Sequence, residues 1–272
     1  MTKTVNSPTP ERPDVLSEYE RCQMRAIADW KGAGPGVMSG LINRVASTAG
    51  KLAGRILPGA PVEQVLEWIN KAAAHINQDD SVLKDKELQA RGITQFEALA
   101  AQPLEFADNL ADRCIAEAGQ MALGVGAATG AGGPIAVAVG IPAMLFGTLR
   151  LIHRVAHCYG YRFTPEQEQG VMIGVLSLSM ATTPEQRAHA MEEYRQRIET
   201  SFIHAALEES ANKALQRVVL GQEAGALIPG FNVALNAYLN RQFIIRAGTS
   251  AKRLFQEQWL RERGKAGWIA PA

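Results

Sequence analysis

One short stretch in the second half of the chain holds the residue types best suited to chemistry. His153 and His157 are four residues apart, so on a helix both imidazoles lie on one face. Two imidazoles at this spacing can chelate a divalent metal ion. The pair lacks the adjacent glutamate of a zinc-protease helix, which makes it a weak motif by itself. It therefore predicts at most a candidate metal site.

Two carboxylates, Asp108 and Asp112, are also spaced four residues apart and precede a long apolar segment. If that segment folds back on itself, they meet Arg150, Arg154 and the two histidines at one end. One interpretation of such a cluster is the metal or acid–base centre of a metal-dependent hydrolase. The other is a set of ion pairs in which arginines clamp the base of the fold. We favour the ion pairs.

The apolar segment itself covers residues 118–149 and carries no charged side chain. Glycines at 130, 132 and 133 followed by Pro134 predict that one helix ends there and another begins. Each helical arm has about 12 to 16 residues, fewer than the roughly 20 needed to cross a bilayer. We expect a buried helical hairpin. A hairpin that dips into a membrane or inserts fully is the alternative.

The rest of the chain shows helical apolar spacing and no β-hairpin signature. We therefore expect an all-α fold, a single multi-helix domain around the central Gly-rich apolar hairpin. This domain is expected over residues 14–263, after a flexible N-terminal tail (1–13) and before a C-terminal tail (264–272).

Several helix starts can be read from capping residues. The sequence Thr-Pro-Glu-Gln occurs at Thr164 and again at Thr183, placing a threonine at the cap and a proline at the first helical position. A capping box is also expected between Thr94 and Glu97, and Asp14 is expected to cap the first helix.

The last helix is expected over residues 231–263 and becomes basic along its length. Basic residues that alternate with aromatic ones suit contact with anionic lipid head groups. The alternative is an amphipathic helix packed on the core, which two glutamates in its basic half favour. The residues expected to contact a membrane or an anion are Arg246, Lys252, Arg253, Trp259 and Arg261.

The overall composition excludes some classes of partner. The chain has 272 residues and a net charge of +1, without the concentrated positive field that nucleic acid requires.

The three cysteines form no CxxC pair, which favours a reducing compartment. Cys114 and Cys158 are expected to be core atoms. The N-terminus lacks the apolar core of a signal peptide, so we expect a cytoplasmic protein, with peripheral membrane attachment as an option.

Three local sequences together carry a family resemblance. They are an opening helix that contains Leu-Ser-Glu-Tyr-Glu from Leu16 and ends in Trp30, the run Leu149–His153 leading to Tyr159-Gly-Tyr, and Ile228-Pro-Gly ahead of the basic helix. Their order around a Gly-rich apolar centre resembles the EcsC protein family over most of residues 14–263. That family is named for a bacterial protein encoded beside an ABC transporter. The resemblance implies a link to membrane transport or secretion, and it supplies no catalytic residues.

We therefore expect a non-enzymatic protein of the cytoplasmic face that binds a membrane, a membrane-protein partner such as a transporter, or an apolar ligand. The alternative function is the metal-dependent hydrolase described above. No cofactor is expected, and the sequence leaves the oligomeric state open.

Overall fold

The computed structural model describes residues 16–33, 80–131, 133–163, 165–181, 183–199 and 233–272. Over these residues it contains helices and no strand, so the fold is all-α as predicted. The helices are α1 (Glu18–Gly32), the short 3-10 helix η1 (Asp80–Lys84), α4 (Lys86–Ala90), α5 (Phe96–Ala100), α6 (Leu104–Ala131), α7 (Gly133–Cys158), α8 (Pro165–Met180), α9 (Pro184–Glu199) and α11 (Val233–Glu262).

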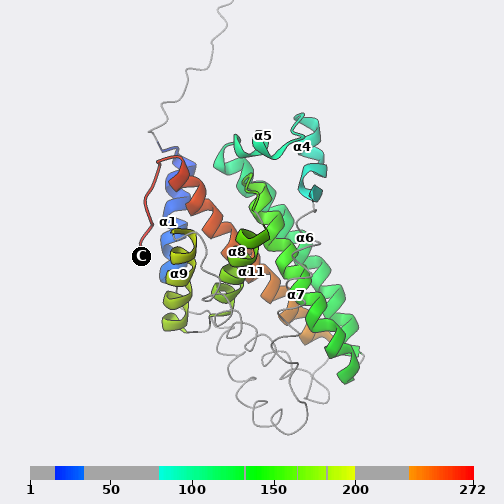
Figure 1. Cartoon of the computed structure of the whole chain (residues 1–272). Helices are drawn as coiled ribbons and strands as arrows, with labels where there is room; N and C mark the ends of the chain where they lie inside the picture. The colour runs from blue at the N-terminus through cyan, green and yellow to red at the C-terminus, as the bar shows by residue number, and fades with distance from the viewer. Residues whose placement is uncertain (1–15, 34–79, 132, 164, 182, 200–232) are drawn as a thin grey trace, which may run out of the picture.

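Three long helices, α6, α7 and α11, pack side by side along the molecule (Figure 1). α11 runs antiparallel to α6, because Gln256 bonds to Asp108 while Lys252 bonds to Asp112, one turn further along each helix. Gly248 continues this register. A Cβ atom there would lie 2.7 Å from Ile115 Cγ1, so the glycine is what allows α11 to approach this closely.

α6 and α7 form the predicted pair of arms. α6 ends at Ala131 and α7 begins at Gly133, within the glycine–proline segment where the sequence predicts a break. Their described halves run antiparallel, because Cys114 lies against Cys158 and Glu117 pairs with Arg154. The side chains of residues 125–145 lie outside the description.

The expectation that the hairpin is buried holds for only part of its length. Ala118, Ala122 and Leu149 are buried in the common core. Met121 and Phe146, only a few residues away, are exposed. Burial of the hairpin is therefore incomplete at Met121 and Phe146.

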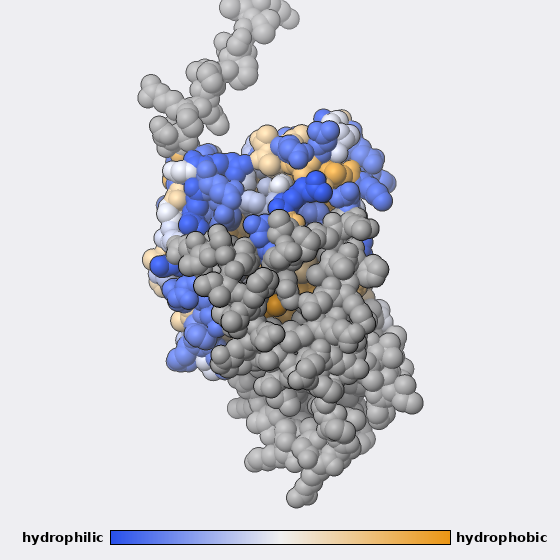
Figure 2. All heavy atoms as spheres, viewed as in Figure 1, coloured by the Kyte–Doolittle hydropathy of each residue, from blue (hydrophilic) through white to orange (hydrophobic). Residues whose placement is uncertain are grey.

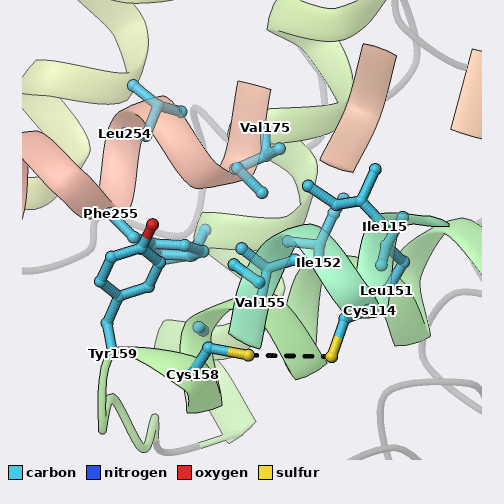
Figure 3. Close-up of a cluster of buried hydrophobic side chains, with 14 of the residues drawn as sticks. Cys114, Ile115, Leu151, Ile152, Val155, Cys158, Tyr159, Val175, Leu254 and Phe255 are labelled. Carbon is cyan, nitrogen blue, oxygen red and sulfur yellow. Dashed lines mark hydrogen bonds between the residues drawn. The ribbon is translucent and has the colours of Figure 1, made fainter. Parts of the chain in front are cut away.

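The main core lies where α6, α7, α8 and α11 meet, and Figure 3 shows its aliphatic and aromatic side chains. Every residue of α8 from Val171 to Ser179 is buried, so this short helix is enclosed by its neighbours. α9 covers α8 closely, since a Cβ atom at Gly174 would lie 2.9 Å from the Tyr194 ring. On the face drawn in Figure 2, the visible described surface is mostly hydrophilic.

The C-terminal residues 264–272 pack on α1 (Figure 1). The backbone amide of Ala272 donates to Ala28 O at 3.0 Å. Lys31 joins this segment to α11, because its ammonium group contacts Glu257 at 2.6 Å and Ile269 O at 2.8 Å. The predicted C-terminal tail is thus an ordered part of the domain, whereas the predicted tail 1–13 lies outside the described residues.

The helix caps follow the predictions in part. Thr183 accepts the amide of Gln186 at 3.2 Å and caps α9 as predicted, and Thr164 lies outside the described residues. α1 is capped by Ser17 through a reciprocal capping box with Glu20, three residues after the predicted Asp14. The predicted box at Thr94 is wrong, because α5 begins after Gln95 and has no side-chain cap.

Candidate functional site

A single buried carboxylate joins four helices at the base of the hairpin. Asp108 on α6 is 0% exposed. It accepts hydrogen bonds from Tyr19 Oη of α1 at 2.6 Å and from Tyr159 Oη, just after α7, at 2.6 Å. A third donor is Gln256 Nε2 of α11, at 2.7 Å. We call these four residues the Asp108 cluster.

The electrostatics of the Asp108 cluster follow from its burial. Burial raises the pKa of Asp108, although the three donors act in the opposite direction. Burial also raises the pKa of Tyr159, and the charge of Asp108 adds to this effect. The partners of Asp108 are therefore neutral hydrogen-bond donors, in place of the arginines and histidines that the sequence predicted. Such a saturated network holds helices together.

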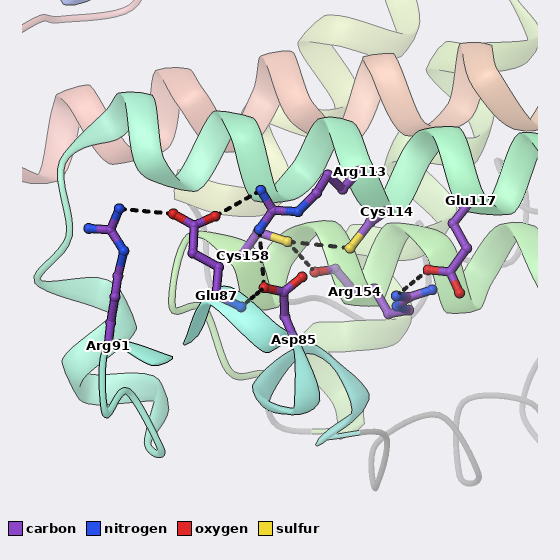
Figure 4. Close-up of polar contacts among 8 residues, drawn as sticks. All are labelled: Asp85, Glu87, Arg91, Arg113, Cys114, Glu117, Arg154 and Cys158. Carbon is purple, nitrogen blue, oxygen red and sulfur yellow. Dashed lines mark hydrogen bonds and ion pairs between the residues drawn. The ribbon is translucent and has the colours of Figure 1, made fainter. Parts of the chain in front are cut away.

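The other predicted charged residues pair separately. Asp112 contacts Lys252 of α11 at 2.7 Å, at the surface. Arg154 contacts Glu117 of α6 at 2.7 Å (Figure 4), and Arg150 is half-buried on α7. An arginine does clamp α6 to α7, as the ion-pair interpretation expected, but its partner is Glu117. The predicted convergence of both aspartates with both arginines is wrong, because Asp108 and Asp112 turn toward α11.

The two histidines lie together inside the fold. His153 and His157 are both buried, and their ring centroids are 3.9 Å apart. His157 also packs on Phe96, with centroids 4.3 Å apart. Across the residues that the structure describes, no group of three His, Cys, Asp or Glu side chains could hold a metal ion. The two imidazoles thus lie together, as the four-residue spacing predicts, but the described residues supply no third ligand for a catalytic metal.

The basic helix is central, which changes the interpretation of its charges. Trp259 is buried, and Lys252 forms an ion pair with Asp112. Arg253 donates to two glutamines, and Arg246 donates to a backbone carbonyl at the end of α8. Arg261 lies over the ring of a C-terminal tryptophan. α11 thus packs on α6, α7 and α8, as the alternative of a helix packed on the core expected, and lipid contact through these five residues stays a prediction.

Large apolar side chains are exposed elsewhere on the three long helices. Four such residues stand out among those described: Met121 (49% exposed) and Leu123 (39%) on α6, Phe146 (41%) on α7 and Tyr238 (43%) on α11. The antiparallel packing brings them to similar levels along the three helices, away from Asp108. We call this region the apolar end. The sequence signal for it was the uncharged stretch 118–149, which we had assigned to the core.

The model of the EcsC protein family matches residues 21–260 of the 272-residue chain. The chain belongs to the EcsC protein family. Searches for similar curated proteins and for similar solved structures found no match. In this EcsC protein, the matched region includes Asp108, Tyr159 and Gln256, both hairpin helices and the apolar end, whereas Tyr19 of the Asp108 cluster lies just before it.

The EcsC chain also contains a partly open cavity of about 260 Å³ between α8, α9 and α11. Its aromatic lining includes Tyr161, Phe163, Phe255 and Tyr194. The Tyr194 hydroxyl is buried and has no hydrogen-bond partner among the described residues. Sequence reasoning missed this cavity, because its lining comes from separate segments that no local pattern connects.

Among the helices described, none combines the length and apolar character that a bilayer span needs.

Proposed function

We propose that this EcsC protein binds a membrane surface from the cytoplasmic side, by placing the apolar end of the α6–α7 hairpin in the lipid interface. The observation that carries the proposal is the exposure of Met121, Leu123 and Phe146 within a stretch, residues 118–149, that has no charged side chain. Met121 and Leu123 are two residues apart and point to different sides of α6, so the exposed apolar side chains lie around the apolar end and not on one face. Exposed large apolar side chains that lie close together are typical of interaction sites.

The chemistry of this surface favours lipid as its partner. Complete burial of a Leu, Met or Phe side chain is worth about 1.5–3 kcal/mol. Four half-exposed side chains would then contribute about 3–6 kcal/mol, which suits weak and reversible attachment. The stretch 118–149 carries no charged side chain, so its contact with lipid requires no charge to be desolvated.

The other end of the hairpin explains how such a surface is kept in place. The Asp108 cluster joins α6 to α1, α7 and α11, and Arg154 ties α7 to Glu117. These polar contacts hold the two arms together at their base. A firmly held base lets the apolar end meet lipid without unfolding the domain. A peripheral role of this kind fits the transport or secretion link that the family resemblance implies.

Flotation with lipid vesicles tests the proposal. We expect the full chain to float with phosphatidylcholine vesicles, with or without phosphatidylglycerol, and to do so at high salt, because the contact is apolar. Leu123→Glu and Phe146→Glu should each weaken flotation about tenfold or more, since a carboxylate must be desolvated on insertion. The matched control is Ala98→Glu, at an exposed position on α5.

Two results would contradict lipid contact through the apolar end. One is wild-type protein that stays at the bottom of the gradient with every vesicle. The other is equal flotation of Leu123→Glu and Ala98→Glu. Flotation only with phosphatidylglycerol, and only at low salt, would point to a basic surface instead. Circular dichroism of each variant checks that the helices are intact.

A further inference from the structure

Two buried cysteines face each other across the α6–α7 interface. The Sγ atoms of Cys114 and Cys158 are 3.8 Å apart, although the residues are 44 positions apart in the sequence (Figure 3). Both thiols are free and buried. The third cysteine, Cys22 on α1, is exposed. The sequence predicted that Cys114 and Cys158 are core atoms, which is confirmed, but it did not predict that they meet.

We propose that Cys114 and Cys158 are a site of reversible oxidative modification, at which a hydroperoxide converts the dithiol to a disulfide that links α6 to α7. A disulfide needs sulfur atoms about 2.05 Å apart and Cα atoms roughly 4.4–6.8 Å apart, a range that neighbouring side chains on two packed helices can reach. The thiols already touch, so the side chains must move by less than about 2 Å to form the bond. This chemistry does not depend on lipid binding.

The surroundings assign different roles to the two thiols. The hydrogen bond with Cys158 lowers the pKa of Cys114, and the positive charge of Arg154 acts in the same direction. Burial raises the pKa of Cys158 well above its usual range. Arg154 O lies 3.2 Å from the Cys158 thiol and is a second acceptor for its single hydrogen. Cys114 is 4% exposed and Cys158 is 0% exposed, so an oxidant that enters from outside meets Cys114 first and Cys158 resolves the intermediate.

The reaction balances with hydrogen peroxide as the only oxidant. The Cys114 thiolate attacks one peroxide oxygen, the O–O bond breaks, and a sulfenic acid and one water form after protonation of the leaving hydroxide. The Cys158 sulfur then attacks the Cys114 sulfur, the S–O bond breaks, and a second water leaves with the Cys158 proton. Two thiols and one peroxide give one disulfide and two waters. A small dithiol reverses the modification.

The short segment formed by η1 and α4 offers the oxidant a route to the pair. Arg113, next to Cys114, contacts Asp85 at 3.2 Å and Glu87 at 3.1 Å in this segment (Figure 4). Exposed ion pairs of this kind contribute about 0–1 kcal/mol each, whereas Val82 and Leu88 anchor the segment in the core. We therefore expect the oxidant to reach Cys114 when the segment opens as a unit, without unfolding of the three long helices.

Mass spectrometry of the full-length protein tests the proposal. We expect peroxide treatment to lower the intact mass by about 2 Da, the mass of two hydrogens, and dithiothreitol to restore it. Digestion without reductant should give one linked peptide pair that contains Cys114 and Cys158. Cys22→Ser, the matched control, should behave like the wild type. Cys114→Ser and Cys158→Ser should lose the 2 Da change.

A second measurement on the wild type alone covers the case in which a serine variant fails to fold. After peroxide treatment, the protein is unfolded in urea and alkylated. Protection of Cys114 and Cys158 together, reversed by dithiothreitol, supports the proposal. Full alkylation of both residues overturns it, and so does stepwise oxidation of either thiol to a sulfinic acid without a linked peptide.

Discussion

At the scale of single residues, Asp108 is the side chain on which the packing of four helices depends. Asp108→Ala removes the acceptor of three buried hydrogen bonds and leaves Tyr159 and Gln256 without it. We expect the free energy of unfolding to fall by about 3–5 kcal/mol, because unsatisfied buried donors cost about 1–3 kcal/mol each. Urea denaturation measures the change.

The neighbouring aspartate provides a control for that measurement. Asp112 lies one turn from Asp108, but its carboxylate is exposed and pairs only with Lys252 at the surface. Asp112→Ala should change the free energy of unfolding by about 1 kcal/mol or less. If the two alanine variants were equally stable, the Asp108 cluster would have no special role in the fold.

The ionisation of Asp108 also predicts how stability depends on pH. Burial raises its pKa in the folded protein, whereas an unfolded chain has a value of about 3.9. At pH values between the unfolded and the folded pKa, the folded state binds more protons than the unfolded state. The contribution of Asp108 to stability is therefore lost as pH rises through the folded pKa. Asp108→Asn cannot titrate. Relative to Asp108→Asn, the wild type should therefore lose stability as pH rises from about 4. Parallel stability curves would contradict the raised pKa.

The residue scale also shows what a sequence can and cannot predict about a site. Residue types were predicted well: Asp108, Arg154 and both histidines are buried or half-buried in polar or ring contacts. The hydrogen-bond partners of these residues were not predicted, because Asp108 bonds to residues 51, 89 and 148 positions away in the sequence. Helical periodicity relates residues within one helix only, so it cannot show which face of α6 meets α11.

At the scale of helices, close approach at glycine decides how α11 packs. A Cβ atom at Gly248 would lie 2.7 Å from Ile115 Cγ1 and 2.9 Å from Leu151 Cδ2. Gly248→Ala should lower the free energy of unfolding by about 1–3 kcal/mol through overpacking, as thermal or urea denaturation would show. Gly147→Ala is the matched control, since its Cβ atom would meet nothing within 4 Å. It should instead stabilise α7 by up to about 1 kcal/mol. The same effect for both variants would contradict the close packing.

Helix ends were predicted correctly where the residues that determine them are neighbours in the sequence. The Thr-Pro start of α9 and the break between α6 and α7 follow from residues that lie next to each other. The start of α5 was missed by one residue. Thr94 could have capped it, but the helix begins at Phe96, whose ring is buried against His157. Tertiary burial of a ring outweighs a cap worth about 1 kcal/mol.

At the scale of the whole molecule, the sequence correctly predicts an all-α fold but does not show which helices lie at its centre. For the basic helix α11, the sequence left lipid contact and packing on the core open; its apolar face packs on α6 while its charges pair with neighbouring helices. The uncharged hairpin was expected to be wholly buried, yet Met121 and Phe146 are exposed. Charge and hydropathy alone do not show which helices lie at the centre of the fold and which helices surround them.

The central packing of α11 and the exposure of Met121 and Phe146 together move the membrane proposal from the basic helix to the apolar end. A surface of this kind binds through apolar burial, so its attachment should respond to inserted charge more than to salt. Asp108 lies near the start of α6, whereas Met121 and Leu123 lie in its second half. The molecule thus combines a polar, tightly bonded end with an apolar end that offers surface to a partner.

The most direct test of this account is the depth of the apolar end in a bilayer. An environment-sensitive fluorophore would be attached to Met121→Cys, and separately to Ala98→Cys, in full-length protein that carries Cys22→Ser. The account predicts that vesicles shift the emission of the Met121→Cys probe to the blue and that lipid-borne quenchers reach it, while the Ala98→Cys probe stays in water. Unchanged emission from the Met121→Cys probe on protein that floats with vesicles would contradict it.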